Sequence, residues 1–524
     1  MSKPASGAFI PPVIDEGERR PAPQHVRVYR AIRNAMAGGA LAPGDRLPSA
    51  RQLAADWRLA RGAVDEAFAQ LQLEGLIRRR VGDGTYVEAA AASLAAAGLR
   101  SPAQPRQPSD LAHHVLAQAA RLGAGAGAGT GPAAAVRLEC NFVPQRPPTL
   151  HPRAIDLDGF ALPVWRRLLV EAAADRRRDL LGLVPCTGLP ALREAVARYL
   201  GVMRGVACRA EQVVVVASPA EGLNLLVRLL LPAGGSMWVE EPTHSSLPTL
   251  LHSLGARVTG VPLDAHGFDV DAARRRDPAA TLAYLHPLGQ HPLGRRTAVA
   301  RGDELIDWAR RHGRWIVEGH FNDELWPREV QPPALARRDR DRVFLLGTFE
   351  SVMFPSLRLG YVVVPAALAR PFAEAMTLWG PRAPAATQWA LAEFIDRGHL
   401  HARIAALRER YARRRKRVQG VLADRLPAPV RAEPLTPVPT ACLHLPEGES
   451  DLDWLRRLRA RGLVLEPLSA MHWSGRPADR PQGLVLGYGD WSDAVLDAAL
   501  EGLLEELRQG LAATRRAAAA SAAR

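Results

Sequence analysis

Lysine is almost absent from this chain, which has only two lysines among its 524 residues, Lys3 and Lys416. A Schiff base needs an amine that can lose its proton at a fixed distance from an aldehyde, and neither a hydroxyl nor an arginine supplies one. Covalent chemistry of that kind is therefore confined to two positions. The net charge of +14 comes almost wholly from arginine, and it favours a polyanionic partner.

Cysteine is also scarce, and its spacing matches no metal-ligand pattern. The four residues are Cys140, Cys186, Cys208 and Cys442. They are too few for a disulfide framework in a chain of this size, so we predict reduced thiols and no metal site. The sequence also lacks an apolar run of about 18 residues and a charged-then-apolar N-terminal signal. We therefore expect a cytoplasmic protein with no membrane partner.

Hydrophobic residues make up 47% of the chain, which is enough for at least two globular units at this length. Residues 1–24 are polar and punctuated by proline, and we predict a disordered arm. Residues 25–88 then show helical periodicity, a turn with a capping Ser49, a second helical pattern and two short strands around Gly82-Asp83-Gly84. This order predicts a winged helix-turn-helix module.

A flexible linker is predicted at residues 89–136, which are rich in alanine, glycine and proline. Residues 137–510 alternate short apolar runs with helical patterns, which indicates an α/β fold with a mostly parallel sheet covered on both faces. A smaller α+β lobe is predicted at about 390–510, and an alanine-rich tail at 511–524. The strand candidates are 213–216, 237–239, 282–285, 315–317, 343–346 and 361–364.

The first module resembles the GntR family of winged helix-turn-helix regulators. The matching segments are Leu-Pro-Ser-Ala-Arg-Gln-Leu-Ala at 47–54, Ala-Arg-Gly-Ala-Val at 60–64 and Gly-Asp-Gly-Thr-Tyr-Val at 82–87. The resemblance implies double-stranded DNA as the partner, with Arg51 and Arg61 near phosphates or guanine edges. The predicted DNA-binding residues are Arg51, Arg61, Asp65, Arg78, Arg79, Arg80, Gly82, Gly84 and Thr85. The alternative is that these arginines are ordinary solvated helix residues.

One departure from the family concerns base reading. Ala60, Gly62 and Ala63 stand where the family usually offers a serine or threonine. Readout is therefore expected from Arg61, Asp65 and the wing. The run Arg78 to Arg80 beside the wing is expected to follow the DNA backbone electrostatically.

The rest of the chain carries recognisable segments at 181–194, 204–206, 290–294, 315–318 and 357–361, in this order. In these segments it resembles the aminotransferase-like domain that follows a GntR head in the MocR subfamily. The resemblance implies a fold-type I body, a homodimer and a pyridoxal-phosphate (PLP) cleft. Residues 347–361 correspond to the stretch that carries the Schiff-base lysine in such enzymes, and Ser351 stands at the lysine position.

Other cofactor groups are replaced as well. Gly319 and Phe321 stand where the family has the acid that holds the pyridine nitrogen and the tyrosine that reaches the ring hydroxyl. Pro219 removes a backbone N–H from the phosphate cradle, whereas Arg358 is kept. The residues of this degenerate cofactor pocket are Ser218, Pro219, Ala220, His244, Gln290, Gly319, Phe321, Ser351 and Arg358.

These features predict a transcriptional regulator without catalytic residues, whose body dimerises and senses a small or anionic ligand without a Schiff base. One alternative is a PLP-binding regulator or aminotransferase-type enzyme that holds the cofactor non-covalently. Another is a pure dimerisation scaffold, with Met353 and Phe354 filling the cleft. His244 and His320 are read as ordinary pocket or core histidines, and Asp323 and Glu324 as part of a solvated loop.

Overall fold

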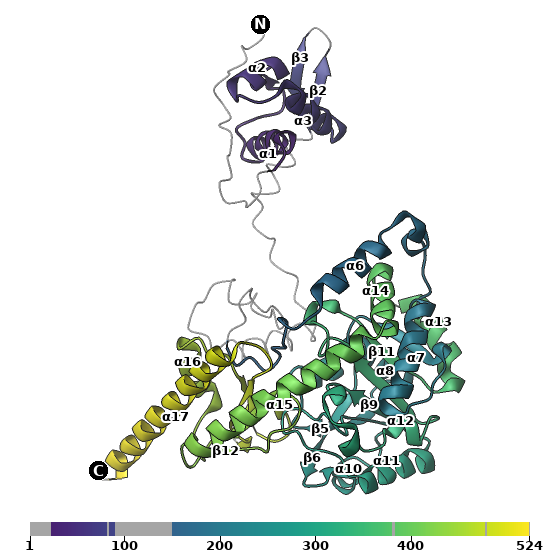
Figure 1. The fold of residues 1–524 in the computed structure, drawn as a ribbon, viewed down its shortest axis with the longest axis vertical. Coiled ribbons are helices and arrows are strands. Elements are labelled where there is room, and N and C mark those ends of the chain that lie inside the picture. The colour runs from purple at the N-terminus through teal and green to yellow at the C-terminus, as the bar shows by residue number, and fades with distance from the viewer. Residues whose placement is uncertain (1–21, 81–82, 90–148, 380–382, 477–478, 523–524) are drawn as a thin grey trace. The chain divides into compact units, whose positions relative to one another are not determined.

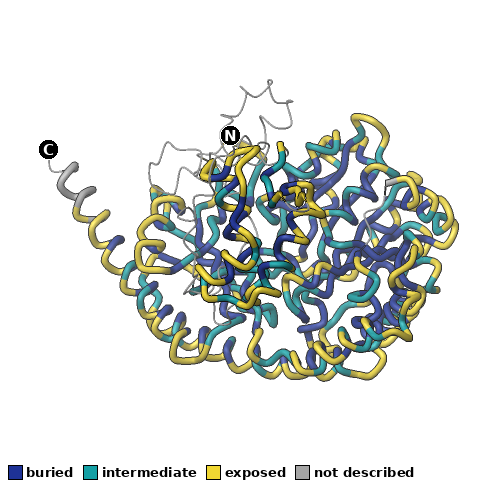
Figure 2. Tube along the Cα trace, turned by 90° about the horizontal axis from the view of Figure 1, so that it is seen from above, coloured by how far each residue is buried: buried dark blue, intermediate teal, exposed yellow. Residues whose placement is uncertain are grey.

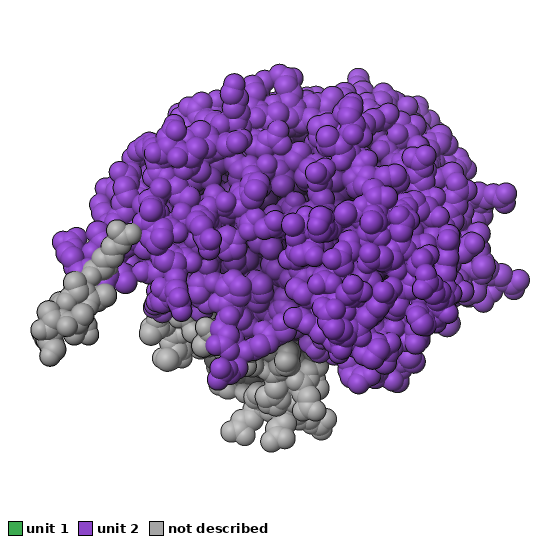
Figure 3. Space-filling view, turned by 90° about the horizontal axis from the view of Figure 1, so that it is seen from below, with its two compact units in different colours: residues 1–109 green, residues 110–524 purple. Residues whose placement is uncertain are grey.

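The computed structural model describes residues 22–80, 83–89, 149–379, 383–476 and 479–522. The chain divides into two compact units, residues 1–109 and residues 110–524. Figure 3 shows one face of the larger unit. The predicted arm and linker fall almost wholly outside the described residues and stay predictions.

The described part of the smaller unit contains three helices and a short antiparallel sheet of order β1-β3-β2 (Figure 1). Val28, Ile32 and Met36 on the first helix are buried against the third helix, as their spacing predicts. Ser49 caps the second helix, because its Oγ accepts a hydrogen bond from the backbone N–H of Gln52 at 3.2 Å. The elements are α1 (Gln24–Ala37), β1 (Arg46–Leu47), α2 (Ala50–Asp56), α3 (Arg61–Leu73), β2 (Ile77–Arg80) and β3 (Gly84–Val87).

The larger unit is built on an eight-stranded sheet of order β4-β11-β10-β9-β8-β5-β6-β7. Strands β10, β9, β8, β5 and β6 are parallel neighbours, whereas β11 runs antiparallel to both β10 and β4. Every strand candidate from the sequence is confirmed, with bounds shifted by a few residues. The strands are β4 (Val213–Val216), β5 (Ser236–Glu241), β6 (Arg257–Asp264), β7 (Gly267–Phe268), β8 (Leu282–Leu285), β9 (Trp315–His320), β10 (Val343–Thr348) and β11 (Gly360–Val363).

Alternate residues of these strands enter two separate cores. Val213 and Val215 belong to one apolar cluster, and Val214 and Val216 belong to another. Because successive side chains of a strand point to opposite faces, the sheet is buried on both sides. Figure 2 shows buried segments of the trace, in dark blue, running through the interior of the larger unit. The covering helices are α6 (Leu162–Ala172), α7 (Pro190–Arg204), α8 (Pro219–Leu230), α9 (Leu247–Ser253), α10 (Val270–Arg276), α11 (Val299–His312), α12 (Leu335–Arg338), α13 (Ala369–Trp379) and α14 (Ala385–Asp396).

A second lobe carries a four-stranded antiparallel sheet of order β12-β13-β15-β14. The long helix α15 (His399–Arg425) joins the two lobes, because Leu400 and Leu407 lie in the main core and Val418 lies in the core of the second lobe. The other elements are β12 (Arg431–Ala432), β13 (Thr440–His444), α16 (Asp451–Ala460), β14 (Glu466–Pro467), β15 (Gly483–Gly487) and α17 (Asp493–Ala522).

The small lobe also uses the beginning of the body. Thr149 forms a parallel bridge with Leu463, and Leu150 is fully buried in the lobe core. The predicted tail is helical as far as Ala522, so the expected boundary at residue 510 falls inside α17. Short 3-10 turns connect the larger elements: η2 (Asp175–Leu181), η3 (Ala210–Gln212), η4 (Asp323–Leu325), η5 (Arg328–Val330), η6 (Pro355–Leu357), η7 (Ala366–Leu368) and η8 (Leu468–Met471).

Candidate functional site

The winged-helix module has a crevice of about 480 Å³ between the start of α2, the helix α3 and the wing. Its lining includes four of the predicted DNA-binding residues, Asp65, Arg79, Gly84 and Thr85. The remaining lining residues are Arg46, Leu47, Pro48, Ser49, Ala50, Gln52 and Phe68. The structure therefore brings three parts of the module to one surface: α2, the recognition helix α3, and the wing formed by β2 and β3.

Arg51 and Arg61 stand near the beginnings of their helices, and both are exposed. The Arg51 side chain makes no hydrogen bond or ion pair with any other residue in the described part of the module. Arg61 lies 3.5 Å from Asp65 across one helical turn, with 70% of its side chain exposed. Both guanidinium groups are therefore accessible to phosphate or base acceptors.

Each arginine of the predicted basic run has an acidic partner inside the module. Arg78 pairs with Glu88 at 2.5 Å, and Arg80 lies 3.7 Å from Asp83. Arg79 is held most firmly: its Nη2 donates to Asp65 at 3.0 Å, and its guanidinium covers the Phe68 ring at 5.3 Å. These contacts reduce the charge that the run offers to DNA.

The wing glycines have separate roles. Gly82 lies outside the described residues. Gly84 has φ of +135°, and a Cβ there would lie 2.6 Å from Arg46 Nε, so glycine is required where this side chain crosses the wing. Thr85 is buried, with 8% of its surface exposed. Sequence reasoning missed Arg46, although it directly precedes the Leu-Pro-Ser stretch that carries the family resemblance.

In the larger unit, the predicted phosphate cradle lies at the start of α8, and its polar groups are engaged within the chain. Ser218 caps the helix by accepting a hydrogen bond from Glu221 N at 3.2 Å. Glu221 Oε2 accepts the backbone N–H of Ala217, and the neighbouring Pro219 has none to offer. Ala220 is exposed on the first turn. Burial raises the pKa of Glu221, which the nearby Arg358 opposes.

Gly319, on β9, lies beside His286, a histidine that the sequence did not mark as a site residue. A Cβ on Gly319 would lie 2.2 Å from His286 Cδ2, so the imidazole takes the space of any larger side chain. His286 is held on both nitrogens, by Glu240 Oε2 at 3.1 Å and by the Tyr284 hydroxyl at 2.9 Å. The Phe321 ring lies 5.0 Å from the same imidazole.

Glu240 and Tyr284 are buried on the strands β5 and β8, whereas His286 is half-buried just after β8. Burial raises the pKa of Glu240 and holds the pKa of Tyr284 well above its ordinary value. The register of β8 and β9 pairs Leu285 with Glu318, which places the next residues, His286 and Gly319, side by side. A glycine between two polar positions at the end of β9 was the only sequence signal for this contact.

Ser351 follows β10 in a turn, and its Oγ is buried without a hydrogen-bond partner in the described structure. Arg358 has positive φ of +52° and lies 3.4 Å from Glu350, with 54% of its side chain exposed. The described residues include a single lysine, Lys416, and it is exposed on α15. Of these two predicted pocket residues, Ser351 thus supplies a hydroxyl and Arg358 a guanidinium.

The two remaining pocket residues are tied to other groups. Gln290 donates its amide N–H groups to the carbonyls of Pro242 and His291, both at 2.7 Å, so it fixes the surrounding loop. His244 contacts Arg153 and lies 3.3 Å from the Ser246 hydroxyl. Burial, followed by the charge of Arg153, holds the pKa of His244 well below its ordinary value.

The prediction that Asp323 and Glu324 belong to a solvated loop is wrong. Each has 1% of its surface exposed, and Arg204 from α7 lies 3.4 Å from Asp323. Glu324 accepts a hydrogen bond from Tyr199 at 2.7 Å. Burial raises the pKa of Glu324 and raises that of Asp323 well above its ordinary value. This buried charge cluster includes His320, whose Nδ1 lies 2.5 Å from the Tyr361 hydroxyl.

Met353 and Phe354 belong to the main core. Met353 is fully buried there, and the Phe354 ring packs at 5.1 Å from Phe160 and 5.6 Å from Trp165. The contacts of these two residues therefore give the scaffold hypothesis no support. Within the part of the chain that the structure describes, no helix is long and apolar enough to cross a bilayer. Among the same residues, no cluster of three or more His, Cys, Asp or Glu side chains could hold a metal ion.

Fold and site together define a class of protein with a winged helix-turn-helix head and an aminotransferase-shaped body. Residues 24–87 match the bacterial regulatory proteins of the gntR family, and residues 156–477 match aminotransferase class I and II. The chain belongs to the GntR family in its MocR-type architecture, and it is a DNA-binding transcriptional regulator.

Two relatives match nearly the whole chain. The probable rhizopine catabolism regulatory protein MocR of Rhizobium meliloti is 30% identical over 486 residues, covering 89% of this chain and 90% of that protein. The HTH-type pyridoxine biosynthesis transcriptional regulator PdxR of Corynebacterium glutamicum is 32% identical over 466 residues, covering 89% and 92%.

Solved structures agree on the fold of the body. The α-aminoadipate aminotransferase LysN of Thermus thermophilus aligns with a TM-score of 0.64 and 22% identity, covering 75% of this chain and 97% of that one. At this level of identity the likeness establishes the fold-type I architecture alone.

Proposed function

We propose that the body of this regulator dimerises and responds to a small ligand without forming a Schiff base, and that it has no aminotransferase activity. The observation that carries this proposal is the state of the cofactor cleft. Ser351 offers no amine, His286 takes the space beside Gly319, and Glu221 takes the backbone N–H of Ala217. Residues that would hold the aldehyde, the pyridine nitrogen and the phosphate of PLP are thus replaced or already engaged.

The DNA-binding head reads paired half-sites in this proposal, because a symmetric dimer presents two heads. Exposed leucines and a valine on α6 and in the segment that packs beside it support a homodimer. They are Leu162, Val170, Leu181 and Leu183, with 61%, 67%, 85% and 95% of their surfaces exposed. Apolar side chains exposed to this degree are typical of a surface that a partner covers. A regulator of this kind works beside the chromosome, in the bacterial cytoplasm.

The decisive experiment incubates the purified full-length protein with PLP. We expect no aldimine absorbance, no cofactor on any peptide after borohydride reduction and no amino-group exchange. Reduction products on Lys416, or transfer of an amino group, would overturn the proposal. Analytical ultracentrifugation of the same sample tests the dimer, and a purely monomeric protein at micromolar concentration contradicts that part.

A second candidate is non-covalent binding of PLP, which one observation favours. Arg358 keeps an exposed guanidinium near the cradle and has Glu350 as its ion-pair partner. A phosphate could compete for that guanidinium. Equilibrium dialysis separates the two candidates, since reversible retention of PLP that Arg358→Gln abolishes supports the second.

A further inference from the structure

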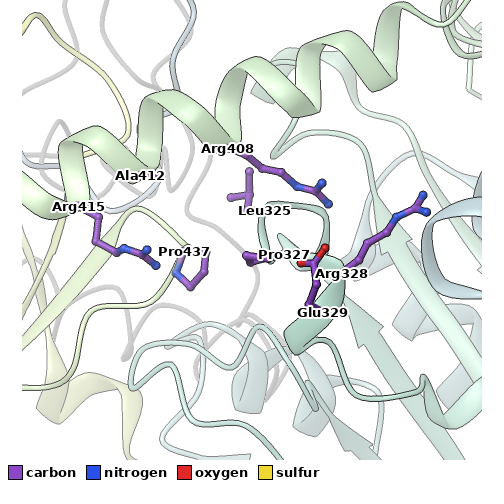
Figure 4. A pocket seen from close by; sticks show the side chains of 8 residues that line it. All are labelled: Leu325, Pro327, Arg328, Glu329, Arg408, Ala412, Arg415 and Pro437. Carbon is purple, nitrogen blue, oxygen red and sulfur yellow. The ribbon is translucent and has the colours of Figure 1, made fainter.

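A cavity of about 240 Å³ opens on the larger unit between α15 and the segment that follows η4 (Figure 4). It shares no lining residue with the cofactor cleft. Its lining combines three arginines with apolar walls. The residues are Leu325, Pro327, Arg328, Glu329, Arg408, Ala412, Arg415 and Pro437.

The opening results from the spacing of three residues on α15. Arg408, Ala412 and Arg415 lie at positions i, i+4 and i+7, which share one face of an α-helix. Figure 4 shows Arg408 and Arg415 reaching out on either side of Ala412. Because the alanine side chain is short, it leaves space between the two long cationic side chains.

The guanidinium groups around this space are short of acceptors. Arg408 Nε donates to the backbone oxygen of Glu324 at 2.6 Å, but its Nη2 is buried with no hydrogen-bond partner among the described residues. The Arg415 side chain makes no hydrogen bond or ion pair with the residues that the structure describes. Guanidinium groups whose N–H donors lack acceptors favour an anionic ligand in the cavity beside them.

The charged groups around the cavity also favour an anionic ligand. Burial lowers the pKa of Arg408 and the charge of Arg328 lowers it further, whereas the charges of Glu324 and Glu329 raise it. Arg328 itself donates to the backbone oxygen of Val202 at 3.0 Å. Glu329 is the one acid in the lining, and it is exposed. With three arginines and one acid, the lining has a net positive charge.

We propose that this cavity binds a small dianion whose oxygens accept hydrogen bonds from the guanidinium groups of Arg408 and Arg415. Phosphate and carboxylate groups have the planar or tetrahedral oxygen pairs that a guanidinium recognises. The volume corresponds to roughly eight water molecules, which is enough space for a small phosphate monoester or dicarboxylate. The site does not depend on the ligand response proposed for the cofactor cleft.

The test titrates the full-length protein with inorganic phosphate, which carries its charges on one centre, and separately with succinate, which carries them on two. Calorimetry is performed at constant ionic strength, so that general screening is unchanged. We expect saturable binding of at least one of these anions, with one site per chain. Which of the two binds more tightly distinguishes a phosphate ligand from a dicarboxylate.

Three variants decide whether binding occurs in this cavity. Arg415→Gln is expected to weaken binding at least tenfold, and Ala412→Leu to abolish it by filling the gap with a good helix former. Arg413→Gln is the matched control, because Arg413 lies on the same helix with 67% of its side chain exposed and pairs with Glu409. The proposal is overturned if the unmodified protein binds neither anion. It is equally overturned if Arg413→Gln weakens binding as much as Arg415→Gln, or if Ala412→Leu leaves the affinity unchanged.

Discussion

Arg79 and Asp65 form a bridge between the wing and the recognition helix, with the guanidinium Nη2 3.0 Å from the carboxylate oxygen. The same arginine lies over the ring of Phe68, which is buried in the module core. Arg79 therefore fixes the position of the wing, whereas Arg51 remains accessible on α2. Both arginines stay predicted DNA contacts, and we expect Arg51 to act directly on DNA and Arg79 to act mainly through the position of the wing.

Substituting these arginines should separate DNA affinity from stability. We expect Arg51→Ala to weaken DNA binding about tenfold or more and to reduce the salt dependence by about one phosphate contact, without changing the stability of the head. Arg79→Ala should lower that stability by roughly 1 kcal/mol, since it removes an ion pair and a ring contact. Fluorescence anisotropy on a DNA fragment selected by the protein, together with thermal unfolding, measures both. Equal behaviour of the two variants would contradict this division.

The contact between His286 and Gly319 predicts that the stability of the body is unusually sensitive to one methyl group added at position 319. Gly319→Ala should destabilise the body by about 1–3 kcal/mol, because His286 cannot move without breaking its hydrogen bonds to Glu240 and Tyr284. Gly420→Ala is the control, since a Cβ there meets nothing within 4 Å on α15. That change should stabilise the helix by about 0.5–1 kcal/mol. Urea unfolding midpoints report the difference, and a Gly319→Ala protein as stable as the control rules out the packing described.

The cap of α2 gives a third prediction. Ser49→Ala should cost the head about 1 kcal/mol, because the N–H of Gln52 loses its acceptor. Ser49→Asp keeps an acceptor at the same position and should retain most of the stability. Thermal unfolding of the three proteins checks the ranking, which fails if the aspartate variant is as unstable as the alanine variant.

His151 predicts a dependence of stability on pH. Burial, followed by the charge of Arg153, lowers the pKa of His151 from 6.5 to about 4. Its Nδ1 accepts the backbone N–H of Arg153 at 3.1 Å, which requires the unprotonated nitrogen. The unfolded chain therefore binds a proton at His151 more readily than the folded chain does. The stability that unprotonated His151 contributes to the folded state is complete above about pH 6.5 and is lost as the pH falls toward 4.

We expect His151→Asn, which keeps an acceptor but does not titrate, to lose less stability than the unmodified protein between pH 6.5 and 4. Unfolding midpoints at several pH values measure the difference. Buried carboxylates with a raised pKa, such as Glu466, act in the opposite direction but equally in both proteins. Parallel profiles for the two proteins would show that His151 does not titrate as described.

Much of the architecture could be predicted because the patterns are local. Val28, Ile32 and Met36 repeat with helical spacing, and the four valines at 213–216 form a strand buried on both faces. Strand β14 could not be predicted in this way, since its two residues are ordered by pairing with β15. Local sequence specifies an element only where its own periodicity fixes the buried face.

The sequence could nominate residues for the site but could not predict their contacts. Motif order pointed to Gly319, Ser351 and Arg358 as candidates, yet the partner of Gly319 depends on the register of two strands that are distant in sequence. Asp323 was assigned to solvent because its neutralising Arg204 lies on α7, more than a hundred residues earlier. Contacts of this kind arise from tertiary packing, which a single sequence does not reveal.

The bridge between Thr149 and Leu463 has a consequence for how the protein is made. The small-lobe core joins Leu150 to Leu503, so its two halves are translated far apart in time. On the ribosome the large sheet can form first, while the segment at 149–150 waits for α17 to emerge. Early termination of synthesis would therefore leave this early segment without its packing partners, however complete the large sheet already is.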